Sequence, residues 1–326
     1  MNNKILKKLK WGVAGCGRYA EHTFIPTMHM MRKSSVHSVF SNSSERAKEV
    51  ARKHGIPLYF SSHSDFLKSD IDAVYISSAN ADHHRQVIEA AQAGKNILCE
   101  KPLALNSSEA EEMIKVCKEN DVKLAVNYVF HFHPLVKKAK ELIENEMIGK
   151  FISVTTNFNI EIPPSSNFRH SSTDGGGALM DVGTHMIDLL RYFGGEISSI
   201  CGVTDSVVYK SNVDDFASAI AKFEDGGYGY FNVSFNTKKA FNRVEILGHK
   251  GAISIEKMIA NKHSPSKLTI LIEGEAKKSF RKRANKQLQL LKSVQKSFLK
   301  NEEPLVTGND GLINLKIMEE LRKKCL

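Results

Sequence analysis

The sequence predicts an α/β domain with a doubly wound parallel sheet, followed by an α+β domain with an open, mostly antiparallel sheet. Over roughly the first 125 residues, short apolar runs alternate with helical patterns, which is typical of a parallel sheet covered by helices on both faces. After Asn127, strand patterns follow one another with few helices between them, and consecutive strands pair antiparallel. The chain has 326 residues, of which 41% are hydrophobic, more than a single core usually holds. We therefore expect two domains, residues 1–126 and 127–326, and leave open that the C-terminal helix packs back on the first.

The first domain is expected to contain six strands and four helices. Asp82–Ala93 ends at Gly94, a common helix stop, and Ser107 or Ser108 is expected to cap Ser107–Glu119. The other two helices are Tyr19–Met31 and one that starts near Ser44. The expected strands are Leu9–Ala14, Val36–Phe40, Leu58–Phe60, Ala73–Ser77, Asn96–Cys99 and Lys123–Val126.

The second domain is expected to be richer in strands. A helix around Leu135–Glu146 precedes a first strand, and a loop rich in Pro, Ser and Asn at Ile162–Thr173 leads to a long helix from about Gly175. Residues 224–227 read Glu-Asp-Gly-Gly between two strand patterns, which predicts a hairpin turn. The expected strands are Phe151–Phe158, Ser199–Val203, Phe216–Phe223, Tyr228–Phe235, Asn242–Leu247, Ala252–Glu256 and Leu268–Ile272.

A glycine motif at the end of the first strand indicates dinucleotide binding. Gly15, Gly17 and Ala20 form G-x-G-x-x-A, in which the glycines allow a tight turn and close approach of a pyrophosphate, and the alanine allows close helix packing. The phosphates would lie at the helix N-terminus, where free N–H groups point. Arg18 and Tyr19 lie within this turn and are also candidates for contact. In this position, inside a β-α series, the motif predicts a Rossmann domain.

The residues after the second strand favour NADP over NAD. NAD sites place Asp or Glu there to bind the ribose hydroxyls, and this chain has neither at the strand end. Ser41 and Ser43 offer hydroxyls, and Arg46 offers a guanidinium that matches a 2′-phosphate. The alternative is that Arg46 is a solvated helix residue and both cofactors bind.

Candidate catalytic and cofactor residues follow two further strands. Lys101, in Cys99-Glu-Lys-Pro102, comes after the fifth strand, where the nicotinamide of a bound dinucleotide is expected, and a lysine there can hydrogen-bond a substrate oxygen. Glu100 is a neighbouring cofactor candidate. After the fourth strand, the cofactor candidates are Ser78, Asn80 and His83.

The long helix of the second domain carries a row of polar residues on an apolar background. Asp181, His185 and Asp188 are spaced i, i+4 and i+7, so they are expected on one stripe. Such residues are costly to bury unless they face a polar pocket. His185 is the natural general acid or base, because an imidazole titrates near neutrality. Asp181 is expected to orient it or to bind substrate hydroxyls.

Two histidine pairs raise the question of a metal. His131 and His133 are expected to share a strand face, and His83 and His84 follow Asn80. Neither pair offers the third and fourth ligands that a zinc site needs, so we expect no metal.

Charge and cysteine usage bear on partners and location. The net charge is +10, and much of it lies in residues 277–300, where Leu288, Leu290, Leu291, Val294 and Phe298 recur at helical spacing. We expect an amphipathic helix with a solvated basic face there, with a phosphate-bearing ligand or an acidic partner as the alternative. A nucleic-acid partner is not expected, because no recognition motif is present. No stretch approaches the apolar length of a membrane span. Five scattered cysteines and the lack of a signal-peptide apolar run favour the cytoplasm.

Three motifs in this order resemble the Gfo/Idh/MocA family (glucose–fructose oxidoreductase, inositol dehydrogenase, rhizopine catabolism). They are GCGRYA near the N-terminus, CEKP after the fifth strand and GGGALMDVGTHMIDLLRYFGG in the second domain, and the resemblance spans essentially the whole chain. It implies an oxidoreductase in which Lys101 and His185 bracket the reacting oxygen and Asp181 assists. It also implies a homo-oligomer, a dimer or tetramer, formed through the second-domain sheet.

Within the family, the chain resembles the NADP-dependent 1,5-anhydrofructose reductases, whose serine and arginine matching Ser41 and Arg46 hold the 2′-phosphate. Many family members carry Arg in the segment that here contains Tyr128, Phe130 and His131, and we expect Tyr128 and His131 to contact substrate. Gly183 in Asp-Val-Gly-Thr-His also departs from those reductases. The substrate is therefore expected to be sugar-like, with a nucleotide- or phosphate-bearing sugar as one alternative and a non-catalytic NADP-binding sensor or scaffold as the other.

Overall fold

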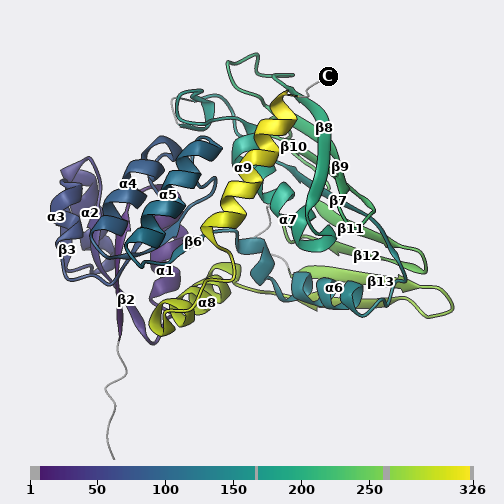
Figure 1. Cartoon of the computed structure of the whole chain (residues 1–326), viewed down its shortest axis with the longest axis horizontal. Coiled ribbons are helices and arrows are strands. Elements are labelled where there is room, and N and C mark those ends of the chain that lie inside the picture. The colour runs from purple at the N-terminus through teal and green to yellow at the C-terminus, as the bar shows by residue number, and fades with distance from the viewer. Residues whose placement is uncertain (1–7, 166–167, 260–264, 324–326) are drawn as a thin grey trace, which may run out of the picture. The chain divides into compact units, whose positions relative to one another are not determined.

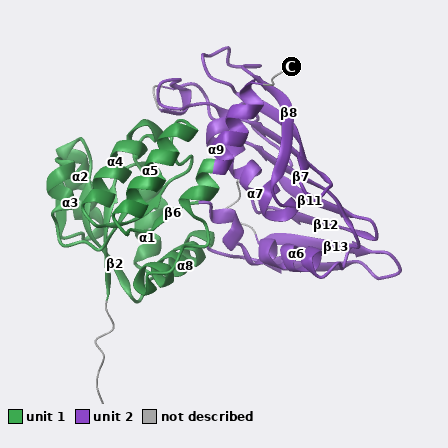
Figure 2. Ribbon diagram, viewed as in Figure 1, with its two compact units in different colours: residues 1–127, 286–312 green, residues 128–285, 313–326 purple. Residues whose placement is uncertain are grey.

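The computed structural model describes residues 8–165, 168–259 and 265–323, and these form two compact units (Figure 2). Unit 1 comprises residues 1–127 and 286–312, and unit 2 comprises residues 128–285 and 313–326. The expected second domain, 127–326, differs from unit 2 because residues 286–312 group with the dinucleotide-binding half. The first seven residues and Cys325, used above for charge and cysteine arguments, lie outside the described residues.

Unit 1, whose helices α2, α4, α5 and α8 are labelled in Figure 1, is built on a six-stranded parallel sheet. The strand order is β3-β2-β1-β4-β5-β6. This order reverses direction at β1 and β4, and the crevice at such a point is where α/β sheets bind ligands. The central strands are buried on both faces, as their continuous apolar runs predict. The strands are β1 (Leu9–Ala14), β2 (Ser34–Phe40), β3 (Leu58–Phe60), β4 (Ala73–Ile76), β5 (Asn96–Cys99) and β6 (Leu124–Val126).

The helices of unit 1 follow the expected series with three differences. The segment expected as one helix over Tyr19–Met31 is a π-turn, η1, followed by a short α-helix that ends three residues early. Asn106, rather than Ser107 or Ser108, caps α5 by accepting from the Glu109 amide at 2.9 Å. A short helix, α3, was not expected. The bounds are η1 (Ala20–Phe24), α1 (Ile25–Met28), α2 (Ser44–His54), α3 (His63–Leu67), α4 (Asn80–Gln92), α5 (Ser107–Glu119) and α8 (Lys286–Lys300).

Helix α8 joins the core of unit 1 although it lies about 160 residues beyond β6 in the chain. Leu290, Leu291 and Val294 are buried, and Phe298 stacks on Trp11 of β1 with ring centroids 5.7 Å apart. The expectation of one amphipathic helix in the basic segment holds only from Lys286 onward. Residues 278–282 form an exposed edge strand, β14, because they pair with the preceding strand.

Unit 2 contains an eight-stranded sheet in the order β14-β13-β12-β11-β7-β10-β9-β8. Its pairs are antiparallel except for β7 with β10, which run parallel. The expected hairpin turn joins β9 to β10, and Gly226 and Gly227 supply the positive φ angles it needs. The strands are β7 (Phe151–Asn159), β8 (Ile197–Asp205), β9 (Phe216–Phe223), β10 (Tyr228–Ser234), β11 (Arg243–Gly248), β12 (Gly251–Glu256), β13 (Ser266–Ile272) and β14 (Lys278–Lys282).

The helices of unit 2 include the buried one that carries the candidate catalytic row. It begins at Leu179 as a π-turn, η4, and continues as α7, four residues later than the expected start at Gly175. Residues 178–190 are all buried, and α7 packs on β7 and β10. The bounds are η2 (Val129–Phe132), α6 (Pro134–Glu144), η3 (Phe168–His170), η4 (Leu179–Gly183), α7 (Thr184–Gly194) and α9 (Gly308–Lys323), whose first residues belong to unit 1.

Within the described ranges, every helix is too short or too polar to cross a membrane.

The docking of α8 can be tested with the chain's single tryptophan, Trp11. Replacing Phe298 by Ala removes a buried ring from the interface with β1 and should lower the free energy of unfolding by about 3–5 kcal/mol. Trp11 fluorescence during denaturant unfolding measures this, and Lys296→Ala, on the exposed side of α8, should leave the midpoint nearly unchanged. Equal midpoints for Phe298→Ala and the native chain would contradict the packing described.

Candidate active site

The glycine turn after β1 has the shape that a dinucleotide pyrophosphate requires. Gly15 has φ +98°, and a β-carbon there would lie 2.5 Å from the backbone nitrogen of Ser78. Gly17 is open, since its nearest neighbour to a β-carbon is the Ser77 carbonyl oxygen at 3.9 Å. Ala20 is fully buried, whereas Arg18 and Tyr19 are exposed at the start of the helix. A backbone that is closed at Gly15 and accessible at Gly17 fits an anion bound at the helix N-terminus.

A hydrogen-bond network holds the segment that carries Lys101. The partly buried Glu100 carboxylate accepts from the Tyr75 hydroxyl, the Asn127 side-chain amide and the Lys101 backbone amide. Burial raises the pKa of Glu100, although these donors and the Lys101 charge oppose the shift. Glu100 is thus engaged by protein groups, and it fixes the backbone on which Lys101 stands. The Lys101–Pro102 peptide is cis.

The network extends to α8 through a residue that the sequence did not single out. Gln287 is 3% exposed, donates to the Asn127 side-chain oxygen at 3.2 Å and accepts from the Tyr19 hydroxyl at 2.9 Å. It therefore connects the glycine turn with the Glu100 cluster. No local motif marks Gln287, because its partners are 160 and 268 positions away.

The candidates after β4 divide into two kinds. Ser78 donates to the Gln86 side chain at 2.8 Å and Asn80 begins α4. His83 is fully buried and donates through Nδ1 to the Pro102 carbonyl at 3.0 Å. The expectation that His83 contacts the cofactor is wrong, because the side chain is fully buried. Its ring supports the turn after Lys101, and no part of it is accessible to a ligand.

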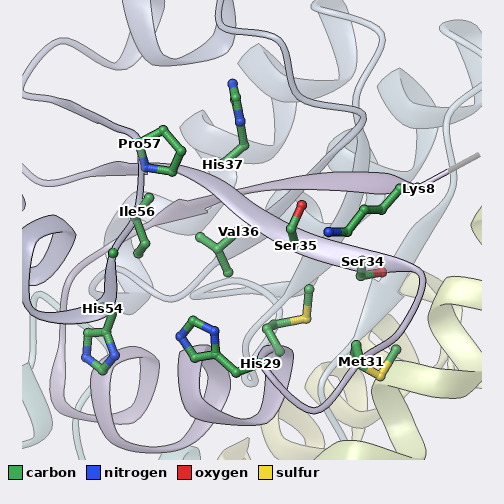
Figure 3. Close-up of a pocket in the computed structure, with 12 residues that line it drawn as sticks. Lys8, His29, Met31, Ser34, Ser35, Val36, His37, His54, Ile56 and Pro57 are labelled. Atoms are coloured by element: carbon green, nitrogen blue, oxygen red, sulfur yellow. The ribbon is translucent and has the colours of Figure 1, made fainter.

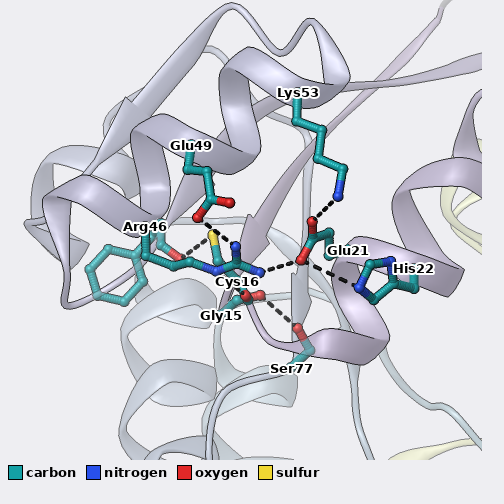
Figure 4. Close-up of polar contacts among 9 residues, drawn as sticks. Gly15, Cys16, Glu21, His22, Arg46, Glu49, Lys53 and Ser77 are labelled. Carbon is teal, nitrogen blue, oxygen red and sulfur yellow. Dashed lines mark hydrogen bonds and ion pairs between the residues drawn. The ribbon is translucent and has the colours of Figure 1, made fainter.

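The residues expected at the 2′-phosphate lie in the turn after β2 and in the first turn of α2. Figure 4 shows the contacts of Arg46. Ser43 caps α2 by accepting from the Arg46 amide at 3.2 Å, and Ser41 accepts from the Ser43 amide at 3.3 Å. Arg46 is engaged by two carboxylates, Glu21 and Glu49, and donates through Nε to the Cys16 carbonyl at 3.1 Å. Glu21 was not predicted from the sequence, because a charged residue directly after Ala20 belongs to no motif.

In unit 2, the carboxylate of Asp181 is held by an arginine from the preceding loop. Arg169 Nε donates to Asp181 Oδ2 at 2.7 Å, and the guanidinium lies over the Phe168 ring. The Arg169 carbonyl accepts from the Gly177 amide, so the loop is tied to the turn that precedes η4. Asp181 is 7% exposed, so this charge is compensated inside the unit.

His185 lies among aromatic rings. Phe130 meets it edge-on with ring centroids 5.0 Å apart, and Tyr128 does so at 5.9 Å. Tyr128 is fully buried, bonds to the Thr184 hydroxyl at 2.6 Å, and has a pKa raised by burial. Its hydroxyl therefore positions the helix beside His185. His185 is 8% exposed, and these rings form part of its surroundings.

His131 pairs with the third member of the expected stripe. Its Nε2 lies 2.8 Å from Asp188 Oδ2, which is 2% exposed, and its ring packs on Tyr192. His133 instead caps α6, accepting from the Leu135 amide at 3.1 Å. The expectation that His131 and His133 share a strand face is wrong, because the segment is a 3-10 turn followed by a helix cap. Asp188 therefore pairs with His131, whereas Asp181 pairs with Arg169.

A surface pocket of about 360 Å³ lies beside the first residues of β2, at the end of that strand away from the glycine turn. Its lining includes His29, His37 and His54 (Figure 3). Dinucleotides bind at the carboxyl ends of such strands, so this pocket is separate from the glycine turn. Among the described residues, no cluster of His, Cys, Asp or Glu is arranged to hold a metal ion.

Two family models match the chain. The N-terminal one, described as an oxidoreductase family with an NAD-binding Rossmann fold, covers residues 9–128. The second, the GFO/IDH/MocA C-terminal domain, covers residues 136–254. The chain belongs to the Gfo/Idh/MocA family. It is an NAD(P)-dependent oxidoreductase, as the glycine turn of unit 1 indicates.

Relatives of this Gfo/Idh/MocA protein agree with the assignment over most of its length. D-xylose 1-dehydrogenase (NADP(+)) 2 of Haloferax volcanii is 30% identical, over 70% of each chain. The 1,5-anhydro-D-fructose reductase of Ensifer adhaerens is 27% identical, over 94% of this chain and 93% of its own. Among solved structures, the aldose–aldose oxidoreductase of Caulobacter crescentus, complexed with glycerol, has a TM-score of 0.89 at 25% identity and covers 98% of this chain and 97% of its own.

Proposed function

We propose that the protein interconverts a secondary alcohol and a ketone on a sugar or polyol, with NADP favoured over NAD. The observation that carries this proposal is His185, set among aromatic rings on a buried helix that also carries the paired carboxylate of Asp181. Relatives named for xylose and anhydrofructose support a substrate with neighbouring hydroxyls. A nucleotide- or phosphate-bearing sugar is tested in the same assay.

The proposed reaction assigns a role to each candidate residue. The dinucleotide, when bound at the glycine turn, would supply or accept the hydride. Lys101 donates a hydrogen bond to the reacting oxygen and stabilises negative charge there. His185 takes the hydroxyl proton during oxidation and returns it during reduction. Asp181, held by Arg169, accepts hydrogen bonds from substrate hydroxyls. Tyr128, expected to contact substrate, is instead fully buried and bonded to Thr184 of α7. His131 contacts Asp188 of the same helix and stays a candidate substrate residue.

Substitution of the two proposed catalytic residues tests this assignment. His185→Ala and Lys101→Met should each lower kcat by about 10²–10⁴-fold, because each removes a proton-transfer or oxyanion-stabilising group. The dissociation constant for NADPH should change little. Turnover is measured by reduced-cofactor absorbance with a panel of ketoses, anhydro sugars, aldoses, inositols and nucleotide sugars.

The matched control is His249→Ala, which removes an exposed histidine from the same unit as His185. It should retain full turnover. If His185→Ala and His249→Ala were equally active on the best substrate, His185 would have no catalytic role. Cofactor binding by the native chain with no turnover on any substrate would favour a sensor or scaffold.

Replacing Ser41 by Asp tests the cofactor preference. A carboxylate at the end of β2 repels a 2′-phosphate and accepts bonds from ribose hydroxyls, so the NADP-to-NAD ratio of kcat/KM should fall about tenfold or more. Ser108→Asp places the same charge on an exposed turn of α5 and should leave the ratio unchanged. An unchanged ratio in Ser41→Asp would remove Ser41 from the cofactor site.

We further propose that the chain forms a homo-oligomer, a dimer or tetramer, through one face of the unit 2 sheet. Ile220 and Tyr230 are paired across β9 and β10 and are 50% and 37% exposed. Tyr228, Leu247 and Leu271, on the same sheet, are 46–49% exposed. Such a set of exposed apolar side chains is typical of an interface.

A cytoplasmic location is consistent with the free thiols of Cys16, Cys99, Cys117 and Cys201.

Introducing charge on this face should dissociate the assembly. The double variant Ile220→Lys, Tyr230→Lys places two buried charges in the proposed interface, so the mass measured by light scattering should fall to that of one chain. Leu305→Lys, at a similarly exposed apolar residue of unit 1, is the control and should keep the native mass. A double variant that kept the native mass would place the interface elsewhere.

A further inference from the structure

A buried carboxylate lies directly after the glycine turn, where it meets the residue proposed to bind the 2′-phosphate. Glu21 is 4% exposed, and its two oxygens are bound by Arg46 and by Lys53, the latter at 2.6 Å (Figure 4). His22 Nε2 lies 3.7 Å from the oxygen that Arg46 binds. Arg46 is thus held on one side by Glu21 and on the other by the exposed Glu49.

The charges in this cluster cancel. Arg46 and Lys53 contribute two positive charges, and Glu21 and Glu49 contribute two negative charges. Three of the five N–H groups of the Arg46 guanidinium make the contacts with Cys16, Glu49 and Glu21, and the side chain is 31% exposed. The two neighbouring carboxylates reduce the electrostatic attraction of Arg46 for a doubly charged phosphate.

The negative charge on Glu21 is present at any pH near neutrality. The bonds from Lys53 and Arg46 lower the pKa of Glu21 to about 2 despite its burial. Because the carboxylate is shielded from solvent, its field on Arg46 is screened less than that of the exposed Glu49. Glu21 should therefore exert the stronger electrostatic effect on Arg46.

We propose that Glu21 is a specificity-determining residue that limits the preference for NADP by neutralising Arg46, with Lys53 offsetting part of this effect. The inference rests on the proposed role of Arg46 at the 2′-phosphate. It predicts opposite outcomes for two neighbouring substitutions. Removing the charge of Glu21 strengthens NADP binding relative to NAD, and removing the charge of Lys53 weakens it.

The experiment measures the dissociation constants of NADP⁺ and NAD⁺ by calorimetry, at one pH and low salt, without substrate. Glu21→Gln keeps an oxygen that can accept from Arg46 but adds one unit of net positive charge. The ratio of the NAD⁺ to the NADP⁺ dissociation constant should rise about fivefold. Lys53→Met should lower it by about twofold or more. The Lys53 side chain is 52% exposed, so the second variant tests the idea even if the first folds poorly.

Two controls locate the effect. Glu49→Gln removes the same charge from the other side of Arg46, and because Glu49 is exposed, the ratio should change less. In the Arg46→Ala background, Glu21→Gln should no longer raise the ratio. If Arg46→Ala lowers the ratio but Glu21→Gln leaves it constant or lowers it, the proposed role of Glu21 is wrong and that of Arg46 stands. If Arg46→Ala itself leaves the ratio unchanged, the assignment of Arg46 to the 2′-phosphate fails, whatever Glu21 does.

Discussion

The nucleotide-binding half depends on the hydrogen bonds that the Glu100 carboxylate must accept. A partly buried carboxylate must find donors inside the protein, and here they come from β4, from the residue after β6 and from its own turn. Through Asn127 and Gln287 the same set of bonds reaches Tyr19 in the glycine turn. The turn that approaches the phosphates and the lysine proposed to act on substrate are thereby held by one network. Disturbing any member is expected to affect both.

Unit 2 satisfies the same requirement by pairing its buried polar groups. Asp181 is matched with an arginine from the preceding loop, Asp188 with His131, and Thr184 with Tyr128. The residues of the expected stripe therefore have distinct surroundings even though they lie on one helix. His185, on the same helix, contacts the rings of Tyr128 and Phe130.

Local sequence predicted most of the fold because its signals are short-range. The bounds of β1, β3 and β5 were predicted to the residue, since each is an apolar run bounded by polar or turn residues. The turn at Gly15 followed from its need for positive φ. Predictions from the local sequence pattern were wrong where a contact with a distant segment decided the structure. The basic segment divides into a strand and a helix because β14 finds an edge to pair with, and the His131 segment turns to reach Asp188.

The sequence alone determined the family, the dinucleotide-binding turn and the residue types proposed for catalysis, because each is encoded in a contiguous motif. Tertiary structure decided which charges those residues meet. Glu21 with Arg46, Arg169 with Asp181, and Gln287 with Tyr19 join segments whose side chains carry no mutual sequence signal. Electrostatic energy depends on distance and burial, and neither can be read from spacing along the chain. The residue types of the site could therefore be predicted from the sequence, whereas the fold decided which charged groups lie next to one another.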